Sequence, residues 1–315
     1  MIRYTAIRLL EIAALLVLLS FAIYALIGLM PGDPIDLMRS ADPHMSAADV
    51  ARLKAAQGLD QPLVSRYADW ARRALAGDLG YSRLFATPVW AALLPRLVNS
   101  LLLMGLSFVL ALALALGLGT VAARLPRSRT DAAINLLCFA SVSMPTFWLA
   151  LVLILLFAVG LGWLPAGGTG DSGDLADRAR HLVLPVATLM LASIGGYTRY
   201  VRGAMREALS QDHIRTARAK GASETRVILH HALRGAMIPV TTILALSFGG
   251  LVSGALVTET MFAYPGMGKL IFDAVMGNDY NLALAALMLA SVTAMLANLV
   301  ADLAYGWLDP RISYQ

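Results

Sequence analysis

Six apolar stretches, each long enough to cross a bilayer, constrain the fold of this chain more than any other feature. They cover about residues 7–30, 97–123, 132–161, 182–200, 237–258 and 282–307. A helix of about 20 apolar residues spans the roughly 30 Å hydrocarbon core, where only helices and closed barrels satisfy the backbone. The chain is also 58% hydrophobic and 14% charged, with more apolar surface than one soluble core would bury. The sequence therefore predicts an all-α integral membrane protein with six spanning helices.

The first apolar run follows a short basic start that contains Arg3 and Arg8. A cleavable signal peptide has a shorter apolar core followed by a small-residue cleavage site, whereas this run is long enough to span and ends in Pro-Gly-Asp-Pro at 31–34. We therefore expect residues 1–30 to form a cytoplasmic start and a retained first spanning helix.

Residues 31–96 are mixed in polarity, and their acidic residues nearly balance the basic ones. Ser46 is a suitable N-cap for a short helix over 46–56, and residues 62–76 have an amphipathic helical pattern. The glycine-rich segment 77–82 has turn chemistry. This composition predicts a small helical insert on the extracytoplasmic (periplasmic) side.

Basic residues are distributed unevenly among the connections between apolar runs. Bases follow the second and fourth runs, namely Arg124, Arg127, Arg129, and then Arg199, Arg202, Arg206, Arg215, Arg218, Lys220, Arg226 and Arg234. The loop after the fifth run offers only Lys269. Because cytoplasmic loops carry such an excess, the net charge of +5 indicates membrane topology rather than nucleic-acid binding. Both termini are predicted to be cytoplasmic, with a helical core at 97–307, a cytoplasmic loop at 201–236 and a tail at 308–315.

The third apolar run contains two informative residues. It is longer than one perpendicular crossing requires and contains Pro145, so a tilt or kink is expected there. Cys138 is the one cysteine of the chain, which excludes an intrachain disulfide or a cysteine metal cluster. We expect Cys138 to serve in packing.

The segment Pro-Gly-Met-Gly-Lys-Leu at 265–270 superficially resembles a phosphate-binding loop. The first glycine of that pattern falls on Ala263, its final serine or threonine falls on Leu270, and the topology places the segment outside the cell. If ATP drives this protein, another subunit is expected to bind it.

Two further motifs have weak chemical interpretations. His230 and His231 point about 100° apart on a helix and have no neighbouring carboxylate, so no metal site is predicted. Ser253 would suit an intramembrane protease only with a buried histidine, which the apolar runs lack. Small residues around it favour close helix packing instead. No catalytic residue is predicted.

Polar side chains inside the predicted spans are candidates for a translocation pathway. The candidates are Asn99, Asn135, Glu259, Asn298 and Asp302, with Ser141, Ser143 and Thr146 beside Pro145. Each alone is also explained by an interhelical hydrogen bond or an interfacial position, and Glu11 and Glu259 lie near span ends where water is expected to reach them. As a lining set we select Asn99, Ser141, Ser143, Thr146 and Asn298.

The basic stretch 212–239 has the pattern of a shaped surface rather than of a loose tether. Asp212 is expected to cap a short helix that ends at Gly221 in a left-handed C-cap. Ser223 is expected to start a second helix, with an apolar stripe, that ends near Pro239. Two capped helices favour a docking surface.

Motifs along the whole chain are similar to those of ABC importer permeases of the dipeptide, oligopeptide and nickel family. They are Arg-Thr-Ala-Arg-Ala-Lys-Gly at 215–221, His-Ala-Leu-Arg-Gly-Ala-Met-Ile-Pro-Val at 231–240, Pro-Gly-Asp-Pro at 31–34, Leu-Asp-Gln-Pro-Leu at 59–63, Gly-Asp-Leu-Gly-Tyr-Ser at 77–82, Ser-Val-Ser-Met-Pro-Thr-Phe-Trp-Leu at 141–149, Gly-Trp-Leu-Pro-Ala-Gly-Gly at 162–168, His-Leu-Val-Leu-Pro at 181–185, the run from Glu259 to Leu270, and Leu-Asp-Pro-Arg-Ile at 308–312. The long insert after the first span resembles the first of the two permease subunits in that family, the dipeptide-permease B type.

The resemblance implies a type I importer permease of the inner membrane that forms a heterodimer with a second permease. Two cytoplasmic ATPase subunits, which bind ATP and Mg²⁺, and an extracytoplasmic solute-binding protein would complete the assembly. By position, the ATPase-docking coupling helix would comprise Arg215, Thr216, Ala217, Arg218, Ala219, Lys220 and Gly221. Many importers have Glu-Ala-Ala where this chain has Arg-Thr-Ala at 215–217, so no role that depends on the glutamate charge is carried over.

The function expected from this resemblance is ATP-driven peptide import by alternating access, with this chain forming half of the pathway in contact with membrane lipid. Nickel chelates and glutathione are alternative cargoes of the same machinery. A self-sufficient secondary transporter is the alternative from another class, but it would place ion-coupling acids at mid-span, where this sequence has few.

Overall fold

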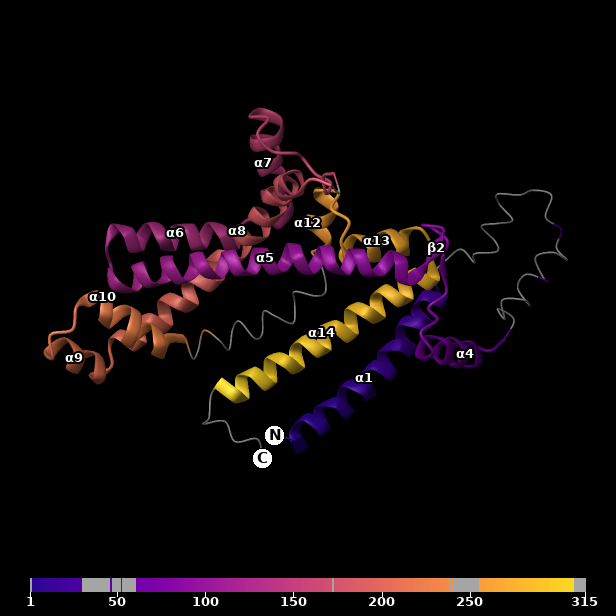
Figure 1. Ribbon diagram of the computed structural model, residues 1–315, viewed down its shortest axis with the longest axis horizontal. Coiled ribbons are helices and arrows are strands. Elements are labelled where there is room, and N and C mark those ends of the chain that lie inside the picture. Colours follow the sequence, from indigo (N-terminus) through magenta and orange to yellow (C-terminus); the bar gives the residue numbers. More distant parts are fainter. Residues whose placement is uncertain are drawn as a thin grey trace.

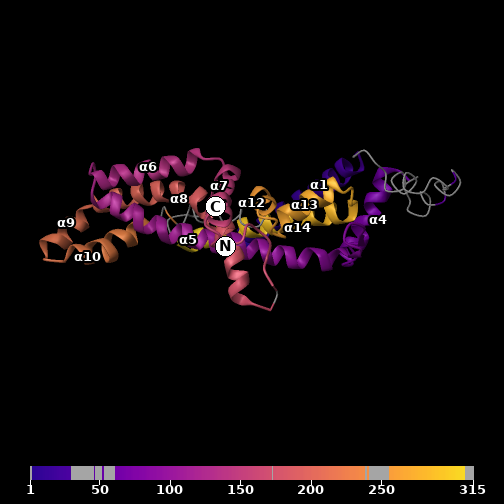
Figure 2. The ribbon, with the colours of Figure 1, turned by 90° about the horizontal axis from the view of Figure 1, so that it is seen from above.

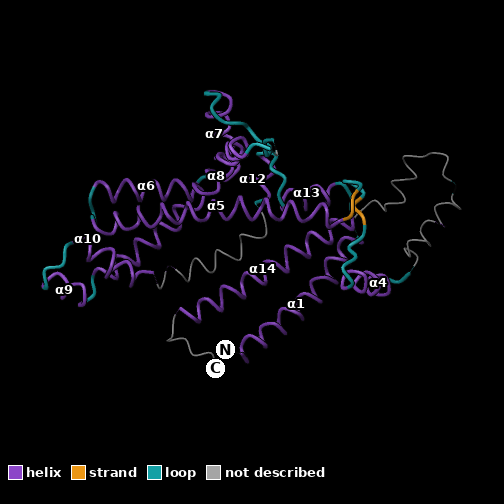
Figure 3. Tube along the Cα trace, in the orientation of Figure 1, coloured by secondary structure: helices purple, strands orange, loops and turns teal. Residues whose placement is uncertain are grey.

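The computed structural model describes residues 2–29, 46, 52, 61–171, 173–237, 240 and 255–308. Its described part is built from long helices, which Figure 1 shows extended along one axis. The long helices α5 (Val89–Arg124) and α8 (Leu175–Leu209) pack against each other, and α6 (Arg129–Ser143) packs on α8. Helices α1 (Ile2–Gly28) and α14 (Tyr280–Leu308) form a second pair side by side (Figures 1 and 3).

Within the described residues, four helices are long and apolar enough to cross a membrane: α1, α5, α8 and α14. The third predicted span, 132–161, is divided between α6 and the pair α7 (Thr146–Leu153) and η1 (Ile154–Gly160), a π-helix. The run at 237–258 lies largely outside the described residues. The structure is therefore an all-α membrane fold whose remaining predicted span is not described.

The division at Pro145 is much sharper than the predicted tilt or kink. The two halves of the third apolar run meet at 105°. Pro145 has no backbone N–H and disfavours a helical conformation at the preceding residue, and Met144 is extended, with φ −82° and ψ 127°. The bend turns α7 away from the direction of α6 (Figure 1).

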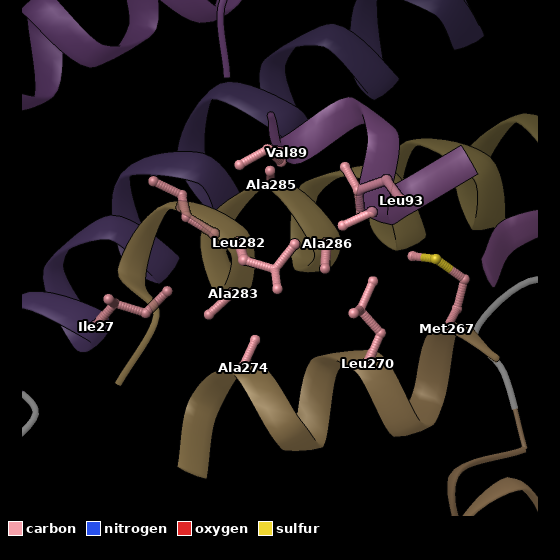
Figure 4. Packing of buried hydrophobic residues seen from close by; sticks show 12 residues of the cluster. Ile27, Val89, Leu93, Met267, Leu270, Ala274, Leu282, Ala283, Ala285 and Ala286 are labelled. Carbon is pink, nitrogen blue, oxygen red and sulfur yellow. The ribbon is translucent and has the colours of Figure 1, made fainter. Parts of the chain in front are cut away.

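Helix α5 begins at Val89 rather than near residue 97, so the insert is shorter than the predicted 31–96. The added turns are held by burial, because Val89 and Leu93 are enclosed in an apolar cluster. Figure 4 shows this cluster, to which α1, α5, α13 (Met267–Met276) and α14 contribute Ile27, Val89, Leu93, Met267, Leu270, Ala274, Leu282, Ala283, Ala285 and Ala286. These elements converge at the end of the molecule opposite the basic loop.

The predicted amphipathic helix of the insert is present as α4 (Leu63–Leu75). A turn with left-handed glycines at Gly77 and Gly80 follows it, leading into a short antiparallel pair of strands, β1 (Tyr81–Ser82) and β2 (Thr87–Pro88). Apart from Ser46 and Arg52, the helix expected at 46–56 lies outside the described residues.

The basic loop projects from the far end of α8 as α9 (Asp212–Ala219), α10 (Glu224–Arg226) and the π-helix η2 (Val227–Ala232), followed by helical residues 233–237 (Figure 2). Figure 1 places α9 and α4 at opposite ends of the long axis. A second apolar cluster supports the loop, with Val201, Met205, Ile214, Val227 and Ala232 at its centre.

Candidate functional site

The short helix α9 is the exposed tip of the basic loop. Its N-cap is Gln211, in an extended conformation with φ −71° and ψ 150°, and no side chain caps it by a hydrogen bond. The prediction that Asp212 caps the helix is therefore wrong, because Asp212 is already the first helical residue. Its carboxylate instead accepts a hydrogen bond of 2.5 Å from Arg215 one turn later, while still placing negative charge at the helix N-terminus.

The C-terminus of α9 has the predicted left-handed glycine. Gly221 has φ +80°. Its N–H donates to the Arg218 carbonyl at 2.9 Å, and the Ala222 N–H donates to the Ala217 carbonyl at 3.1 Å, which together form a Schellman motif. The helix therefore ends in a defined reversal that aims the chain back toward α8.

One buried side chain fixes α9 to the rest of the protein. Ile214 is fully buried against the cluster that contains Met205 and Val227, and Ala217 is half-buried on the same side. Of the predicted docking set, the remaining members are exposed: Arg215, Thr216, Arg218, Ala219, Lys220 and Gly221. The helix thus has one anchored face and one free face.

An ion pair missed by the sequence analysis joins α9 to the second loop helix. Arg218 donates to both carboxylate oxygens of Glu224, at 2.8 and 3.2 Å. These hydrogen bonds lower the pKa of Glu224 below its ordinary value. Ser223 occupies the predicted N-cap position, although its side chain makes no capping hydrogen bond. The pair spans the Gly221 reversal and holds the two helices together.

The candidate pathway residues are dispersed, and no hydrogen bond joins any two of them in the described part of the chain. The Asn99 amide donates to the Pro265 carbonyl at 2.9 Å. Ser141 donates to the Leu191 carbonyl at 2.5 Å, where α6 meets α8. Ser143 and Asn298 are exposed, and Thr146 is half-buried. Ser141 thus has the interhelical hydrogen bond that was the alternative interpretation, and Asn99 bonds to the turn between α12 and α13.

Asn135 belongs to a buried polar network between α6 and α8. Its amide donates to the carbonyl and the carboxylate of Asp131, at 2.7 and 2.8 Å. Arg202 reaches the same carboxylate through two hydrogen bonds of 2.7 and 2.8 Å, and the backbone N–H of Arg127 donates to it at 3.1 Å. Arg202 lies near the C-terminal end of α8, the helix that leads into the basic loop. No local pattern indicates this network, because the partners Asp131 and Arg202 are 71 residues apart.

Glu259 is fully buried, which contradicts its expected position in contact with water. The chain turns back after α12 (Leu256–Met261), so this carboxylate is covered by α13 and α5. Ser100 on α5 donates to Glu259 at 2.5 Å, and the Lys269 N–H donates to it at 2.9 Å. Ser100 also accepts the Met267 N–H at 2.7 Å, so these side chains occupy the N-terminus of α13.

The arrangement around Glu259 explains why 265–270 only superficially resembles a phosphate loop. An internal carboxylate already occupies the place at the helix N-terminus where such a loop would hold a phosphate. A Cβ atom at Gly266 would lie 2.3 Å from that carboxylate. This close approach explains why glycine stands there.

Comparisons with known proteins identify the family of this chain. A sequence model of the family "Binding-protein-dependent transport system inner membrane component" matches residues 115–314, and its N-terminal companion matches residues 1–103. The oligopeptide transport permease AppB of Bacillus subtilis is 40% identical over 90% of both chains, and the di/tripeptide permease DppB of Pseudomonas aeruginosa is 38% identical over 93% of both. The glutathione permease GsiC of Escherichia coli K12 is 36% identical over the full length of both. The chain is therefore a member of the binding-protein-dependent transport system inner membrane component family, the permeases of ABC transporters.

Proposed function

We propose that this chain is the first permease subunit of an ATP-driven importer of peptides. It would form half of a translocation pathway with a second permease subunit. The main structural support is that the short helix α9 is anchored by the buried Ile214 and exposes its basic face. A rigid exposed helix at the end of the molecule fits a docking element that transmits force between subunits.

The proposed orientation places α9 and both termini in the cytoplasm, and α4 with the β1–β2 pair outside. Arginines concentrated around α9 support it, because cytoplasmic loops are enriched in basic residues. Two ATPase subunits, which bind ATP and Mg²⁺, would then contact the exposed docking residues Arg215, Thr216, Arg218, Ala219, Lys220 and Gly221. A solute-binding protein would deliver cargo at the opposite face.

The loop architecture supports a mechanical role for this contact. Displacement of α9 would be passed to α8 through the Ile214 cluster and to the second loop helix through the Arg218–Glu224 pair. The Asp131–Arg202 network then connects α8 with α6. Closure of the ATPases would in this way alter the packing of two spans that border the proposed pathway.

Peptides are the proposed cargo because the peptide permeases above have the higher identities. Glutathione, itself a tripeptide, is the second candidate, since the glutathione permease matches over the full length of this chain. Of the proposed lining residues, Ser143 and Thr146 flank the 105° bend, and Asn298 is exposed on α14.

Uptake measurements test the proposal and separate the cargoes. A strain deleted for this gene would be supplied with labelled dipeptides, longer peptides and glutathione, with and without the restored gene. We expect gene-dependent uptake of peptides that is abolished by vanadate. Gene-dependent uptake of glutathione alone would transfer the assignment to that cargo, and vanadate-insensitive transport by the purified chain would contradict an ATP-driven importer.

A further inference from the structure

We propose that α4 is an interfacial helix that lies in the outer leaflet and binds the headgroups of anionic phospholipids. The proposal rests on α1 spanning the membrane in the orientation proposed above. The helix α4 comprises Leu63–Leu75, and packing against α1 leaves part of its apolar surface exposed.

The first observation is the depth at which α4 contacts α1. The span of α1 covers 24 residues, Thr5–Gly28, or about 36 Å, against a hydrocarbon core of roughly 30 Å. The hydroxyls of Ser20 and Tyr67 are 2.7 Å apart. Ser20 lies about 12 Å along the axis before Gly28. The Tyr67 hydroxyl therefore lies deeper in the membrane than the outer end of α1. This depth places α4 at the level of the membrane interface.

The second observation is an aromatic cluster at this junction. Tyr67 packs edge-on against Phe21 and Tyr24 of α1, with ring centroids 5.2 and 5.7 Å apart, and Trp70 lies 5.9 Å from Tyr24. Tyrosine and tryptophan concentrate where the hydrocarbon meets the headgroups. Phe21 is itself exposed on α1, so the apolar surface of the span continues onto α4.

The third observation is a second apolar face on α4 that the described residues do not cover. At about 100° per residue, Val64, Ala68 and Leu75 fall within an arc of about 40°, beside the arc of Tyr67 and Trp70 that faces α1. Val64 is 65% exposed and Leu75 is 90% exposed. An isolated exposed apolar residue is ordinary, but an aligned face at this depth fits the acyl boundary.

The fourth observation is the charge of the opposite arc, where three arginines, Arg66, Arg72 and Arg73, accompany one acid, Asp69. Asp69 pairs with Arg72. Among the described residues, Arg66 and Arg73 form no ion pair. An excess of arginine on the outer side runs against the usual topological bias. Long arginine side chains placed beside an apolar face reach headgroup phosphates by snorkelling, which accounts for the excess.

Together these observations define an amphipathic helix of limited length with a basic polar face, held at the bilayer surface by the first span. Apolar burial supplies attachment and the arginines supply a preference for negative headgroups. Figure 1 shows α4 beside the outer end of α1, and Figure 2 shows it turned across the long axis of the molecule. The helix would thereby fix the depth of α1 and of the hairpin that follows it.

Spin labels test the position of α4 in the complete transporter reconstituted into nanodiscs. Single cysteines would replace Val64 or Leu75, with Ser65→Cys on the polar arc as the matched control. Cys138→Ala and replacement of other accessible cysteines in the complex leave the introduced cysteine as the one site that the spin label can modify. We expect labels at 64 and 75 to collide readily with oxygen and several-fold less with a water-soluble nickel chelate than the label at 65.

Two results would overturn membrane contact. Equal nickel accessibility at 65 and 75 would place the apolar face in water. Exclusion of both reagents at 64 and 75 would show that protein covers it, either a partner subunit or the segment 30–60 of this chain. Neither readout depends on cargo or on ATP, so failure here is distinguishable from failure of the proposed transport function.

Lipid composition tests the arginines separately. In nanodiscs containing phosphatidylglycerol, the label at 75 should be less accessible to nickel than in nanodiscs of phosphatidylcholine alone. The double variant Arg66→Gln and Arg73→Gln should lose this difference, whereas Arg83→Gln, outside α4, should retain it. Identical depth in both lipids for the unmodified helix would contradict recognition of anionic headgroups.

Discussion

Arg202 on α8 donates two hydrogen bonds to the Asp131 carboxylate at the start of α6, at 2.7 and 2.8 Å. Asp131 is buried, with 6% of its side chain exposed, while 22% of the Arg202 side chain is exposed. Asp131 also belongs to the N-terminal cap of α6, since its N–H donates to Ser128. Asp131 thus belongs to the helix cap through its N–H and joins α6 to α8 through its carboxylate.

We expect Asp131→Ala to destabilise the protein by up to about 3 kcal/mol, because it leaves the Arg202 charge without its partner. The double variant Asp131→Ala and Arg202→Met should recover part of that loss, since no unpaired charge remains. Thermal denaturation of the purified complex measures both. A double variant that is less stable than the single one would contradict the argument.

The left-handed conformation of Gly221 predicts a specific effect on coupling. No atom lies within 4 Å of a Cβ built there, so the cost of substitution is conformational rather than steric. Gly221→Val should cost at least about 1 kcal/mol in the loop and reduce ATP-driven uptake, with normal membrane insertion. Gly221→Asn should retain more uptake, because asparagine tolerates this conformation.

Gly203→Ala is the matched control for Gly221, because Gly203 is an exposed helical glycine on α8 with open space around it. Uptake in proteoliposomes and abundance in membranes are the measurements. Full uptake with Gly221→Val would refute the link between the loop reversal and transport.

Lys220 is the better probe of docking charge than Arg218. Arg218 is already paired with Glu224, so reversing its charge would disrupt the loop as well as the surface. Lys220→Glu changes only an exposed side chain and should lower recovery of the ATPase subunits on co-purification. Unchanged recovery would count against a docking face, provided that a surface control, Arg83→Glu at the opposite end, also leaves recovery unchanged.

The Arg218–Glu224 pair is expected to be insensitive to pH across the physiological range. Because Arg218 lowers the pKa of Glu224, the pair is complete above the ordinary glutamate pKa and is lost only as the pH falls through the lowered value. Hydrogen exchange at 221–226 should be the same at pH 6 and pH 8 after correction for the intrinsic rate. Glu224→Gln should increase exchange at both pH values, and a variant that exchanges like the parent would show that the pair does not order the loop.

The buried Glu259 predicts strict size limits at Gly266. Gly266→Ala places a methyl group against the carboxylate and should destabilise the junction of α5, α12 and α13 by about 1–3 kcal/mol. Gly105→Ala, in α5 with nothing within 4 Å, is the control and should be near neutral. Equal melting temperatures for the two variants would argue against this packing.

Helices and helix ends could be predicted from the sequence, whereas the angles and contacts between segments far apart in the chain could not. The apolar runs predicted α1, α5, α8 and α14, the C-cap pattern predicted the left-handed Gly221, and Pro145 predicted a tilt or kink in the third apolar run. The size of the bend was missed because a proline specifies where a helix stops rather than the angle of the next one. Residues 97–99 looked like the start of a span because hydropathy rises there, yet packing against α14 extends α5 back to Val89.

The same distinction holds for the residues of the candidate site. The exposed face of α9 follows from its sequence. Aspartate is a favoured N-cap residue, so the sequence predicts Asp212 at the cap, but Gln211 occupies that position in the structure. Glu259 was misplaced because its burial depends on a reversal that brings Lys269 and Ser100 onto it. Asn99 stays a predicted pathway residue, and its amide donates to the Pro265 carbonyl, a partner that lies 166 residues away and that its own sequence context does not indicate.

The π-helical turn of η2 sets the rotational phase between the loop and the chain that follows it. Ile228, Ala232, Ala236 and Val240 are all buried at a constant spacing of four. In an α-helix of 3.6 residues per turn, residues four apart are rotated by about 40° around the helix axis relative to one another. The wider π-helical turn of η2 reduces this rotation. Deleting one residue from 227–232 would rotate the side chains of the helical residues 233–237 by about 100° relative to α9. The length of this segment therefore sets the orientation of residues 233–237 relative to α9, independent of the chemical identity of its residues.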